Sequence, residues 1–206
     1  MSAIAGLVLA GGKSSRMGGG EKALLDLGGA RLLDRAVARI ASQTDRVAIS
    51  ANGALETYRA LGLPVLPDTL PGHLGPLAGV LAGLRWAKAQ GMSHVASVAG
   101  DTPFFPTDLV TRLGKSLSSS APIAMSETPN EAGRSFRHPT FALWPVDRAD
   151  ELETALLDGV RKIVLWTDAV GCARVVFPAT PFDPFFNINT PDDMNQARAM
   201  MLEHGL

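Results

Sequence analysis

A glycine-rich, positively charged stretch follows a short apolar run near the start of the chain. Ile4–Leu9 is almost entirely apolar, and the chain continues as Leu9-Ala10-Gly11-Gly12-Lys13-Ser14-Ser15-Arg16-Met17-Gly18-Gly19-Gly20-Glu21-Lys22. Glycine lets the backbone come close to a ligand, and successive exposed N–H groups form an anion-binding concavity. Lys13, Arg16 and Lys22 add positive charge to these amides. This composition predicts a loop that binds a polyphosphate.

The stretch differs from the two commonest glycine-rich phosphate loops. A P-loop needs Gly, four residues and then Gly-Lys-Ser/Thr, and the dinucleotide fingerprint needs Gly-x-Gly-x-x-Gly opening a helix. Gly11-Gly12-Lys13 supplies neither pattern. The alternative to a binding loop is an ordinary connection between a strand and a helix, with its charges solvated. The later Arg-Met-Gly and Lys22 favour the binding loop.

Polar side chains end or follow further apolar runs, at Ser50, Asn52, Asp68 and Asp101. In an open α/β sheet, ligands bind outside the carboxyl ends of the strands, so we expect these side chains to converge near the glycine-rich stretch. A carboxylate beside a polyphosphate is repulsive unless a cation intervenes, and Mg²⁺ held by one or two carboxylates plus phosphates is the usual solution. We therefore expect Asp101 to hold Mg²⁺; the alternative is a turn aspartate shortly before Pro103.

The elements that position these residues follow from the spacing of apolar residues. Short apolar runs alternate with helical patterns in the first half of the chain, which predicts a doubly wound, mostly parallel α/β sheet. Thr190 is placed to cap a last helix, with Pro191 at its first position. The expected strands are 4–9, 46–50, 63–66, 94–99, 123–125, 141–144 and 174–177; the expected helices are 32–40, 55–61, a helix through 81–86, 109–117 and 152–157; 163–166 is strand or helix, and 127–137 is a loop or hairpin.

Composition limits the class of protein. With 206 residues, 46% apolar content and a formal net charge of −1, the chain suits one well-buried domain and gives no sign of nucleic-acid or membrane binding. Cys172 is the single cysteine, which excludes an internal disulfide and a cysteine-based zinc site. No apolar run approaches the roughly 20 residues of a membrane span. We expect a soluble, cytoplasmic, monomeric enzyme.

The motif Leu-Ala-Gly-Gly-x-Ser-x-Arg-Met-Gly, followed shortly by Lys22, resembles the opening of the sugar-nucleotide-type nucleotidyltransferases. Within them it is most similar to the molybdenum cofactor guanylyltransferases, which join GMP from GTP to the molybdopterin phosphate and release pyrophosphate. Glu21 stands where that family usually has Asp. The resemblance reaches nearly to the C-terminus. It implies a three-layer, Rossmann-like fold of the nucleotide-diphospho-sugar transferase type, with a nucleotide-binding half at 1–110 and an acceptor-binding half at 111–206.

The resemblance also implies partners and residue roles. The partners are GTP, Mg²⁺, molybdopterin and, transiently, proteins that deliver the cofactor or accept it. Asp68 would recognise guanine, and Ser50 or Asn52 would contact the nucleotide, since the family often has Asn at the position of Ser50. The implied roles are catalysis for Arg16, Lys22 and Asp101; nucleotide binding for Leu9, Ala10, Gly11, Gly12, Lys22, Ser50, Asn52, Asp68, Gly75, Pro76 and Asp101; metal binding for Asp101 and Asn189; and acceptor binding for His138, Arg161 and Asn187.

Two other functions compete with guanylyl transfer. Related enzymes that transfer CMP usually show Leu-Ala-Ala-Gly at the start and Asp-x-Asp-Thr-Pro near the end. This chain has Leu-Ala-Gly-Gly and Asn-x-Asn-Thr-Pro, which favours guanylyl transfer. A non-catalytic nucleotide sensor on the same fold could have lost Arg16, Lys22 or Asp101, and all of these residues are present.

Overall fold

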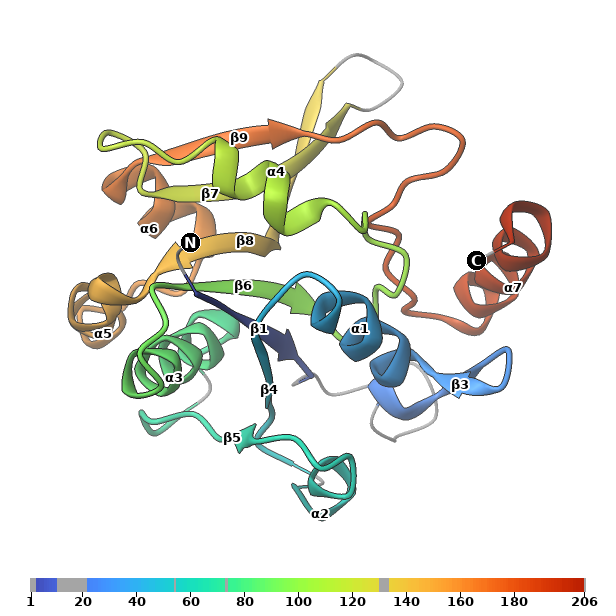
Figure 1. The fold of residues 1–206 in the computed structure, drawn as a ribbon, viewed down its shortest axis with the longest axis horizontal. Coiled ribbons are helices and arrows are strands. Elements are labelled where there is room, and N and C mark those ends of the chain that lie inside the picture. Colours follow the sequence, from blue (N-terminus) through green and yellow to red (C-terminus); the bar gives the residue numbers. More distant parts are fainter. Residues whose placement is uncertain (1–2, 11–21, 54, 73, 130–133, 206) are drawn as a thin grey trace.

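The computed structural model describes residues 3–10, 22–53, 55–72, 74–129 and 134–205, which build a seven-stranded sheet with helices on both faces (Figure 1). The strand order is β5-β4-β1-β6-β8-β7-β9. The neighbours β5, β4, β1 and β6 are parallel, as are β7 and β9, and β8 is antiparallel to β6 and β7. The expected mostly parallel α/β sheet is confirmed. The strands are β1 Ile4–Leu9, β4 Arg46–Ser50, β5 Val65–Leu66, β6 His94–Ala99, β7 Ile123–Pro129, β8 Ser135–Pro145 and β9 Cys172–Val176.

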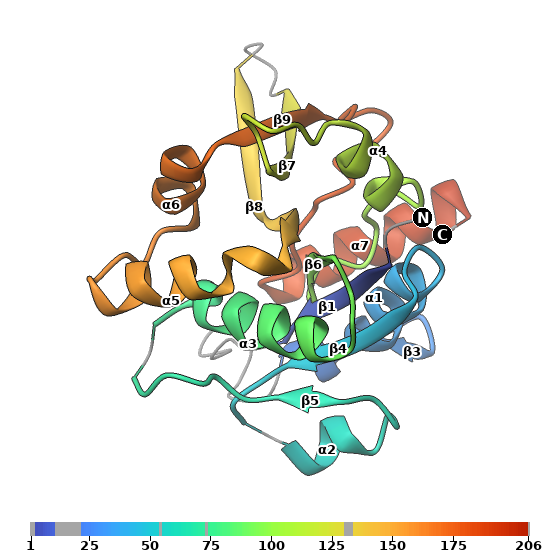
Figure 2. The ribbon, with the colours of Figure 1, turned by 60° about the vertical axis from the view of Figure 1, so that its left-hand side comes forward.

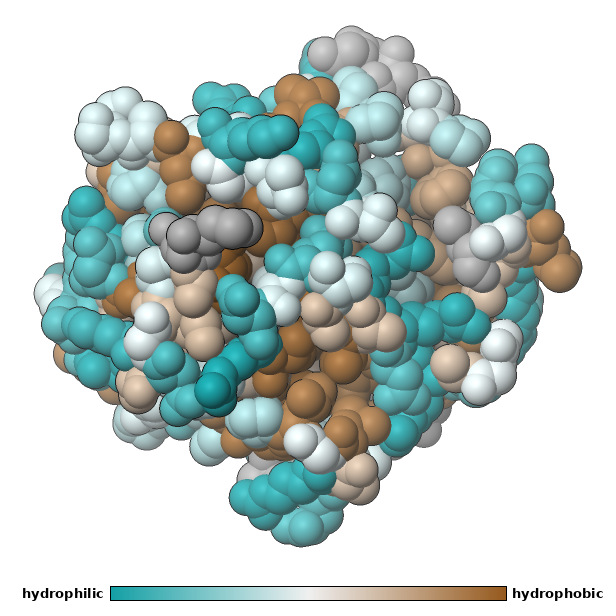
Figure 3. All heavy atoms as spheres, in the orientation of Figure 1, coloured by the Kyte–Doolittle hydropathy of each residue, from teal (hydrophilic) through white to brown (hydrophobic). Residues whose placement is uncertain are grey.

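The helices form two layers because the strands of the sheet are apolar on both faces. One hydrophobic cluster lies beneath α1 Leu32–Ala41, α2 Leu55–Arg59 and α4 Leu109–Lys115. Another lies beneath α3 Pro76–Ala89, α5 Ala149–Leu157 and α6 Ile163–Val170, with α3 and α5 side by side (Figure 2). On the first face, apolar surface remains visible between α1 and α2 (Figure 3).

Glycines in α3 bring this helix close to the carboxyl ends of the central strands. A Cβ on Gly83 would overlap Leu7 Cδ2, and a Cβ on Gly79 would lie 3.1 Å from Leu9 Cδ2 and would overlap Ser50 Oγ. The helix therefore packs its backbone directly against the ends of β1 and β4. This contact fixes the edge from which the glycine-rich stretch departs.

The C-terminal helix packs at the far side of this edge, away from the main sheet. The short 3₁₀ turn η1 Lys22–Leu24 leads into a small hairpin of β2 Asp26–Leu27 and β3 Ala30–Arg31, and α7 Pro191–His204 packs against this hairpin in a separate hydrophobic cluster. Figure 1 shows α7 beside β3, at the rim of the molecule. The packing brings the start of α7 next to Lys22.

The structure resolves two ambiguous segments and adds two short strands. Residues 163–166 begin a helix, α6, in which Ile163 and Trp166 are buried. The polar stretch 127–137 forms a hairpin whose tip, 130–133, lies outside the described residues. The strands β2 and β3 were not expected, because two-residue strands are too short to show periodicity. Among the helices of the described ranges, none is long and apolar enough to cross a membrane.

Candidate active site

Backbone hydrogen bonds join the carboxyl end of β1 to the carboxyl ends of its two neighbours, β4 and β6. The Ala10 N–H donates to the Ser50 carbonyl over 2.9 Å, and the Gly100 N–H donates to the Leu9 carbonyl over 3.0 Å. The start of the glycine-rich stretch therefore lies between the ends of β4 and β6. The expected convergence at this edge is observed for the described residues. Gly11, Gly12 and Arg16 lie outside them.

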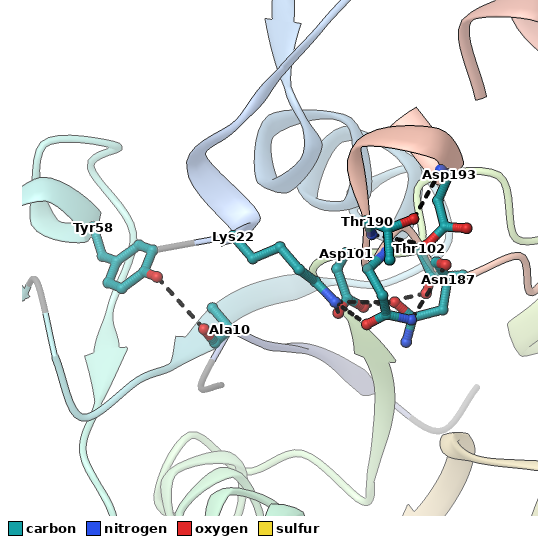
Figure 4. A network of polar contacts seen from close by, with 9 residues as sticks. Ala10, Lys22, Tyr58, Asp101, Thr102, Asn187, Thr190 and Asp193 are labelled. Atoms are coloured by element: carbon teal, nitrogen blue, oxygen red, sulfur yellow. Dashed lines mark hydrogen bonds and ion pairs between the residues drawn. The ribbon is translucent and has the colours of Figure 1, made fainter. Parts of the chain in front are cut away.

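Lys22 connects the end of the glycine-rich stretch to three side-chain oxygens (Figure 4). Its Nζ lies 2.5 Å from Asp101 Oδ2, 2.5 Å from Asn189 Oδ1 and 3.2 Å from Asn187 Oδ1. The side chains of Lys22 and Asp101 are only 15% and 22% exposed. Residues far apart in the sequence thus surround the ammonium group of Lys22.

Backbone contacts hold the two asparagines beside Asp101. The Ile188 N–H donates to the Asp101 carbonyl over 3.1 Å, and the Ile188 side chain is fully buried. Because Ile188 lies between Asn187 and Asn189, this contact fixes both neighbours. The segment that follows β9 is therefore tied to the end of β6.

Asp193 anchors the same segment from the first turn of α7. Its Oδ2 accepts hydrogen bonds of 2.8 Å from the N–H groups of Asn189 and Thr190, and its own N–H donates to Thr190 Oγ1 over 3.1 Å. This is a capping box. The sequence analysis assigned the cap to Thr190 and missed Asp193, although Thr-x-x-Asp is a readable signal for it.

The environment of Asp193 favours its charged form. Partial burial works to raise the pKa of its carboxyl group. The hydrogen bonds from Asn189 and Thr190, together with the charge of Lys22, outweigh that effect and lower the pKa below its ordinary value. The anchor is therefore an ionised carboxylate at neutral pH.

Asn52 and Asp68 form a reciprocal pair where β4 and β5 end. Asn52 Nδ2 donates to Asp68 Oδ2 over 2.8 Å, and the Asp68 N–H donates to Asn52 Oδ1 over 2.8 Å. Ser50 is only 5% exposed and faces Gly79 of α3, whereas Asn52 is exposed. Of the two candidates Ser50 and Asn52, Asn52 is the one whose side chain reaches the surface of the site.

Gly75 and Pro76 open α3, close to the segment that carries Arg161. Gly75 has φ +77°, a conformation that favours glycine, and a Cβ there would lie 3.9 Å from the Arg161 carbonyl oxygen. Arg161 Nη1 donates to the carbonyls of Leu156 and Val160 over 2.6 and 2.9 Å. The structure therefore places the backbone of Arg161 beside Gly75 at the start of α3, and its guanidinium at the end of α5.

His138 lies in an aromatic cluster rather than beside Lys22. It is 7% exposed, its Nε2 is 2.8 Å from Thr128 Oγ1, and its ring stacks on Phe185 with 4.4 Å between centroids. Burial lowers the pKa of His138, and the charge of Asp183 opposes this shift. Of the three residues expected to bind the acceptor, only Asn187 contacts the Lys22 cluster.

Tyr58 is a further residue at the site that the sequence analysis did not find. Its side chain is fully buried beneath α2, and its hydroxyl donates to the Ala10 carbonyl over 3.5 Å (Figure 4). An isolated tyrosine in a short helical pattern carries no sequence signal for such a contact. It links the segment after Asn52 to the start of the glycine-rich stretch.

The oxygens around Lys22 suit a hard divalent cation. A carboxylate oxygen and two amide oxygens are ligands of the kind that Mg²⁺ takes in proteins. Within the described ranges, no group of three or more His, Cys, Asp or Glu side chains could hold a metal. A cation bound to Asp101 would therefore depend on further oxygens from a ligand, as phosphate groups provide.

Comparison with known proteins identifies the family. The family model described as the MobA-like NTP transferase domain matches residues 6–170. The chain belongs to the MobA-like NTP transferase family. Members of this family are nucleotidyltransferases, and the resemblance seen in the opening motif is confirmed.

Similar proteins cover nearly the whole chain. A molybdenum cofactor guanylyltransferase from Mesorhizobium japonicum is 47% identical over 96% of both chains, and one from Rhizobium meliloti is 44% identical over 95% of this chain and 90% of its own. Among solved structures, molybdopterin-guanine dinucleotide biosynthesis protein A from Archaeoglobus fulgidus is 25% identical, with a TM-score of 0.71 over 97% of this chain and 99% of its own. A 4-diphosphocytidyl-2C-methyl-D-erythritolsynthase from Anaerococcus prevotii, 12% identical, has a TM-score of 0.73 over 98% and 99%. This last likeness shows the fold alone.

Proposed function

We propose that this MobA-like NTP transferase carries out Mg²⁺-dependent transfer of GMP from GTP to the molybdopterin cofactor. The products are the molybdopterin guanine dinucleotide form and pyrophosphate. The observation that carries the proposal is the cluster of Lys22, Asp101, Asn187 and Asn189 at the carboxyl edge of the sheet. It supplies a cation and hard oxygens where the glycine-rich stretch, the proposed polyphosphate loop, ends. The names of the relatives that cover nearly the whole chain support guanine and molybdopterin as the substrates.

The chemistry requires charge stabilisation and little acid–base catalysis. An oxygen of the acceptor phosphate attacks the α-phosphorus in line, a new P–O bond forms, and the bond to the bridging oxygen of pyrophosphate breaks. Negative charge accumulates on the α-phosphoryl oxygens and on the leaving pyrophosphate. Lys22 stabilises the α-phosphoryl charge, because its ammonium group lies 2.5 Å from Asp101 Oδ2, beside the oxygens that would hold the metal. Because the Ala10 N–H already donates to the Ser50 carbonyl, the amides that follow it, beginning at Gly11 and Gly12, bind the β- and γ-phosphates together with Arg16.

Asp101 would hold the divalent cation, with Asn189 as a neutral oxygen ligand. When bound, Mg²⁺ neutralises charge on the phosphates and orients them for attack. The fit rests on the convergence of Asp101 Oδ2 and Asn189 Oδ1 within 2.5 Å of one ammonium group. The role of the protein is to hold these oxygens in place through the backbone contact of Ile188 and the capping carboxylate of Asp193.

Asp68 and Asn52 recognise the guanine base. A carboxylate accepts two hydrogen bonds from the N1–H and the amino group of guanine, and neither adenine nor cytosine offers this pair. The reciprocal hydrogen bonds of 2.8 Å between Asn52 and Asp68 support the assignment, because they hold both side chains in fixed orientations. Gly75 and Pro76 lie at the turn where the base or ribose approaches the backbone.

The acceptor binds on the side of the site formed by the second half of the chain. Asn187 Oδ1 lies 3.2 Å from Lys22 Nζ, and the segment of Arg161 lies beside Gly75. His138 acts on the acceptor through Phe185, which packs against it two positions before Asn187. We expect the enzyme to act as a cytoplasmic monomer that meets cofactor-delivering or cofactor-accepting proteins transiently.

The second candidate function is CMP transfer to molybdopterin or to another small phosphate acceptor. Isothermal titration of the protein with GTP, CTP and ATP in Mg²⁺ separates the two functions. We expect tight binding of GTP and weak binding of the other nucleotides, followed by pyrophosphate release when molybdopterin is added. Equal or tighter binding of CTP would contradict guanylyl transfer. If the nucleotide binds but releases no pyrophosphate with any acceptor, the protein is a nucleotide sensor.

A further inference from the structure

The ammonium group of Lys22 occupies the position that a metal ion bound to Asp101 would need. Its Nζ is bonded to Asp101 Oδ2, Asn189 Oδ1 and Asn187 Oδ1, at 2.5, 2.5 and 3.2 Å. The charges of Lys22 and Asp101 cancel, so the cluster as it stands offers no net negative charge to a cation. A divalent ion bound to the same oxygens would lie within a few ångströms of the ammonium group, where two like charges repel strongly.

We propose that Lys22 and the divalent metal ion compete for these oxygens, so that the metal binds with the nucleotide and not before it. Without nucleotide, the ammonium group of Lys22 neutralises Asp101 and excludes the metal. When nucleotide arrives, its α-phosphate attracts the ammonium group and its phosphate oxygens complete the coordination of the metal. The role of the nucleotide in this exchange rests on the proposed function.

The structure favours movement of Lys22 over movement of the oxygens. The backbones that carry Asp101 and Asn189 are held by the Ile188 N–H and the carboxylate of Asp193, over 3.1 and 2.8 Å. Lys22 is held by its charged end, which sits on a flexible four-carbon stem. Exchange of one cation for another therefore leaves the oxygen set intact and displaces only the lysine side chain.

Titration of the nucleotide-free, full-length protein with Mn²⁺ tests the competition, with free Mn²⁺ followed by electron paramagnetic resonance. We expect Lys22→Met to bind Mn²⁺ about tenfold or more tightly than wild type, because a positive charge beside the ion is removed. Lys22→Arg keeps the charge and should bind as weakly as wild type. Lys115→Met removes an exposed lysine of α4 and should also match wild type. The double variant Lys22→Met with Asp101→Asn should lose the gain.

A second measurement repeats the Mn²⁺ titrations of wild type and Lys22→Met in the presence of nucleotide. A non-hydrolysable GTP analogue should tighten Mn²⁺ binding to wild type by a larger factor than it does for Lys22→Met. Mn²⁺ affinity of Lys22→Met at or below that of wild type would overturn the proposal. The titrations without nucleotide use neither guanine nor pterin, so loss of GTP selectivity would contradict the proposed function and leave this result standing.

Discussion

The side chain of Lys22 connects a segment near the N-terminus with the segment that precedes the C-terminal helix. It follows the glycine-rich stretch, and it is bonded to Asp101 at the end of β6 and to the asparagines before α7. In the proposed reaction, we expect Lys22 to act on the negative charge that grows during phosphoryl transfer, because its ammonium group lies at the oxygens that would hold the metal. Its contribution should therefore appear in turnover.

We predict that Lys22→Ala lowers turnover much more than it weakens GTP binding. The loss of one donor to a developing charge costs about two to three decades in rate. Pyrophosphate release at saturating GTP gives the turnover, and titration calorimetry gives the binding. Lys115→Ala on the exposed side of α4 serves as the control and should behave as wild type. Near-normal turnover of Lys22→Ala would assign Lys22 a purely structural role.

Asp68 offers a test of base recognition at a single atom. We predict that Asp68→Asn reduces the preference for GTP over CTP by about tenfold to a hundredfold, since hydrogen bonds to a charged acceptor contribute about 1.5–3 kcal/mol. The ratio of the two calorimetric dissociation constants measures the effect. Asp158→Asn removes an exposed aspartate at the end of α5 and should leave the ratio unchanged. An unchanged ratio in Asp68→Asn would move guanine recognition to other groups.

The sequence predicted the position of Asp101 at the carboxyl edge of the sheet better than it predicted the surroundings of His138. Polar residues that follow buried parallel strands must meet at one edge, so Asp101 could be placed without coordinates. The position of His138 depends on its packing against Phe185, a contact between distant segments that leaves no pattern in either. The burial of Ser50 likewise depends on the close approach of α3, a contact between distant segments that the sequence does not predict.

At the scale of elements, the N-terminus of α7 has two functions. Its capping box ends the loop and also holds Asn189 beside Asp101. Folding lowers the pKa of Asp193, so its carboxylate stabilises the fold fully above the unfolded value. That contribution disappears as the pH falls through the lower, folded pKa.

We predict that Asp193→Asn lowers the free energy of unfolding by about 0.5–2 kcal/mol at neutral pH, the usual range for the loss of a helix cap. The difference from wild type should shrink as the pH falls below 3.8, the ordinary value for this group. Urea denaturation across this pH range measures it. Asp192→Asn removes the neighbouring exposed charge of the same helical turn and is the matched control. A difference that does not change with pH would show that the Asp193 charge does not contribute.

The close contact of α3 with β1 leads to a prediction about the stability of the fold. Gly83→Ala should destabilise the fold, because overpacking against the fully buried Leu7 costs about 1–3 kcal/mol, more than the roughly 1 kcal/mol that alanine adds to a helix. Gly114→Ala in α4 is the matched control: its Cβ would lie 3.9 Å from Leu143 Cδ2, an ordinary contact, so it should be neutral or stabilising. Thermal unfolding of both variants measures the difference. Equal stability would show that α3 can shift away from β1.

At the scale of the whole molecule, the sequence predicted the parallel strands but not their order. Alternating apolar runs and helical patterns indicate a doubly wound sheet. They do not reveal that β8 runs antiparallel between β6 and β7, or that the chain after β9 returns to Asp101. These features depend on contacts between residues far apart, such as Ile188 with Asp101. Because the chain after β9 comes back to Asp101, Ile188 of the second half contacts the proposed nucleotide-binding half, 1–110.

We predict that Mg²⁺ and GTP together slow hydrogen exchange in both halves of the chain. A ligand at about 100 times its dissociation constant stabilises the bound state by about 2.7 kcal/mol, which slows exchange through openings that break the site by about a hundredfold. The amides of Ile188, Asn189 and Thr190 donate to Asp101 and Asp193, so they should gain protection together with Asp68, whose N–H bonds Asn52.

The hairpin of β7 and β8 should keep its exchange rates until the pterin phosphate is added, because it carries His138, and its described residues make no contact with Lys22. Mass spectrometry of peptides from the protein with GTP and Mg²⁺, and then with the acceptor, resolves the two steps. Asp101→Asn should lose the protection at Ile188, Asn189 and Thr190 and keep part of the protection at Asp68, since only the former depends on the metal. If protection is confined to 1–110, Asn187 and Asn189 take no part in binding nucleotide. Their contact with Lys22 would then belong to the nucleotide-free protein only.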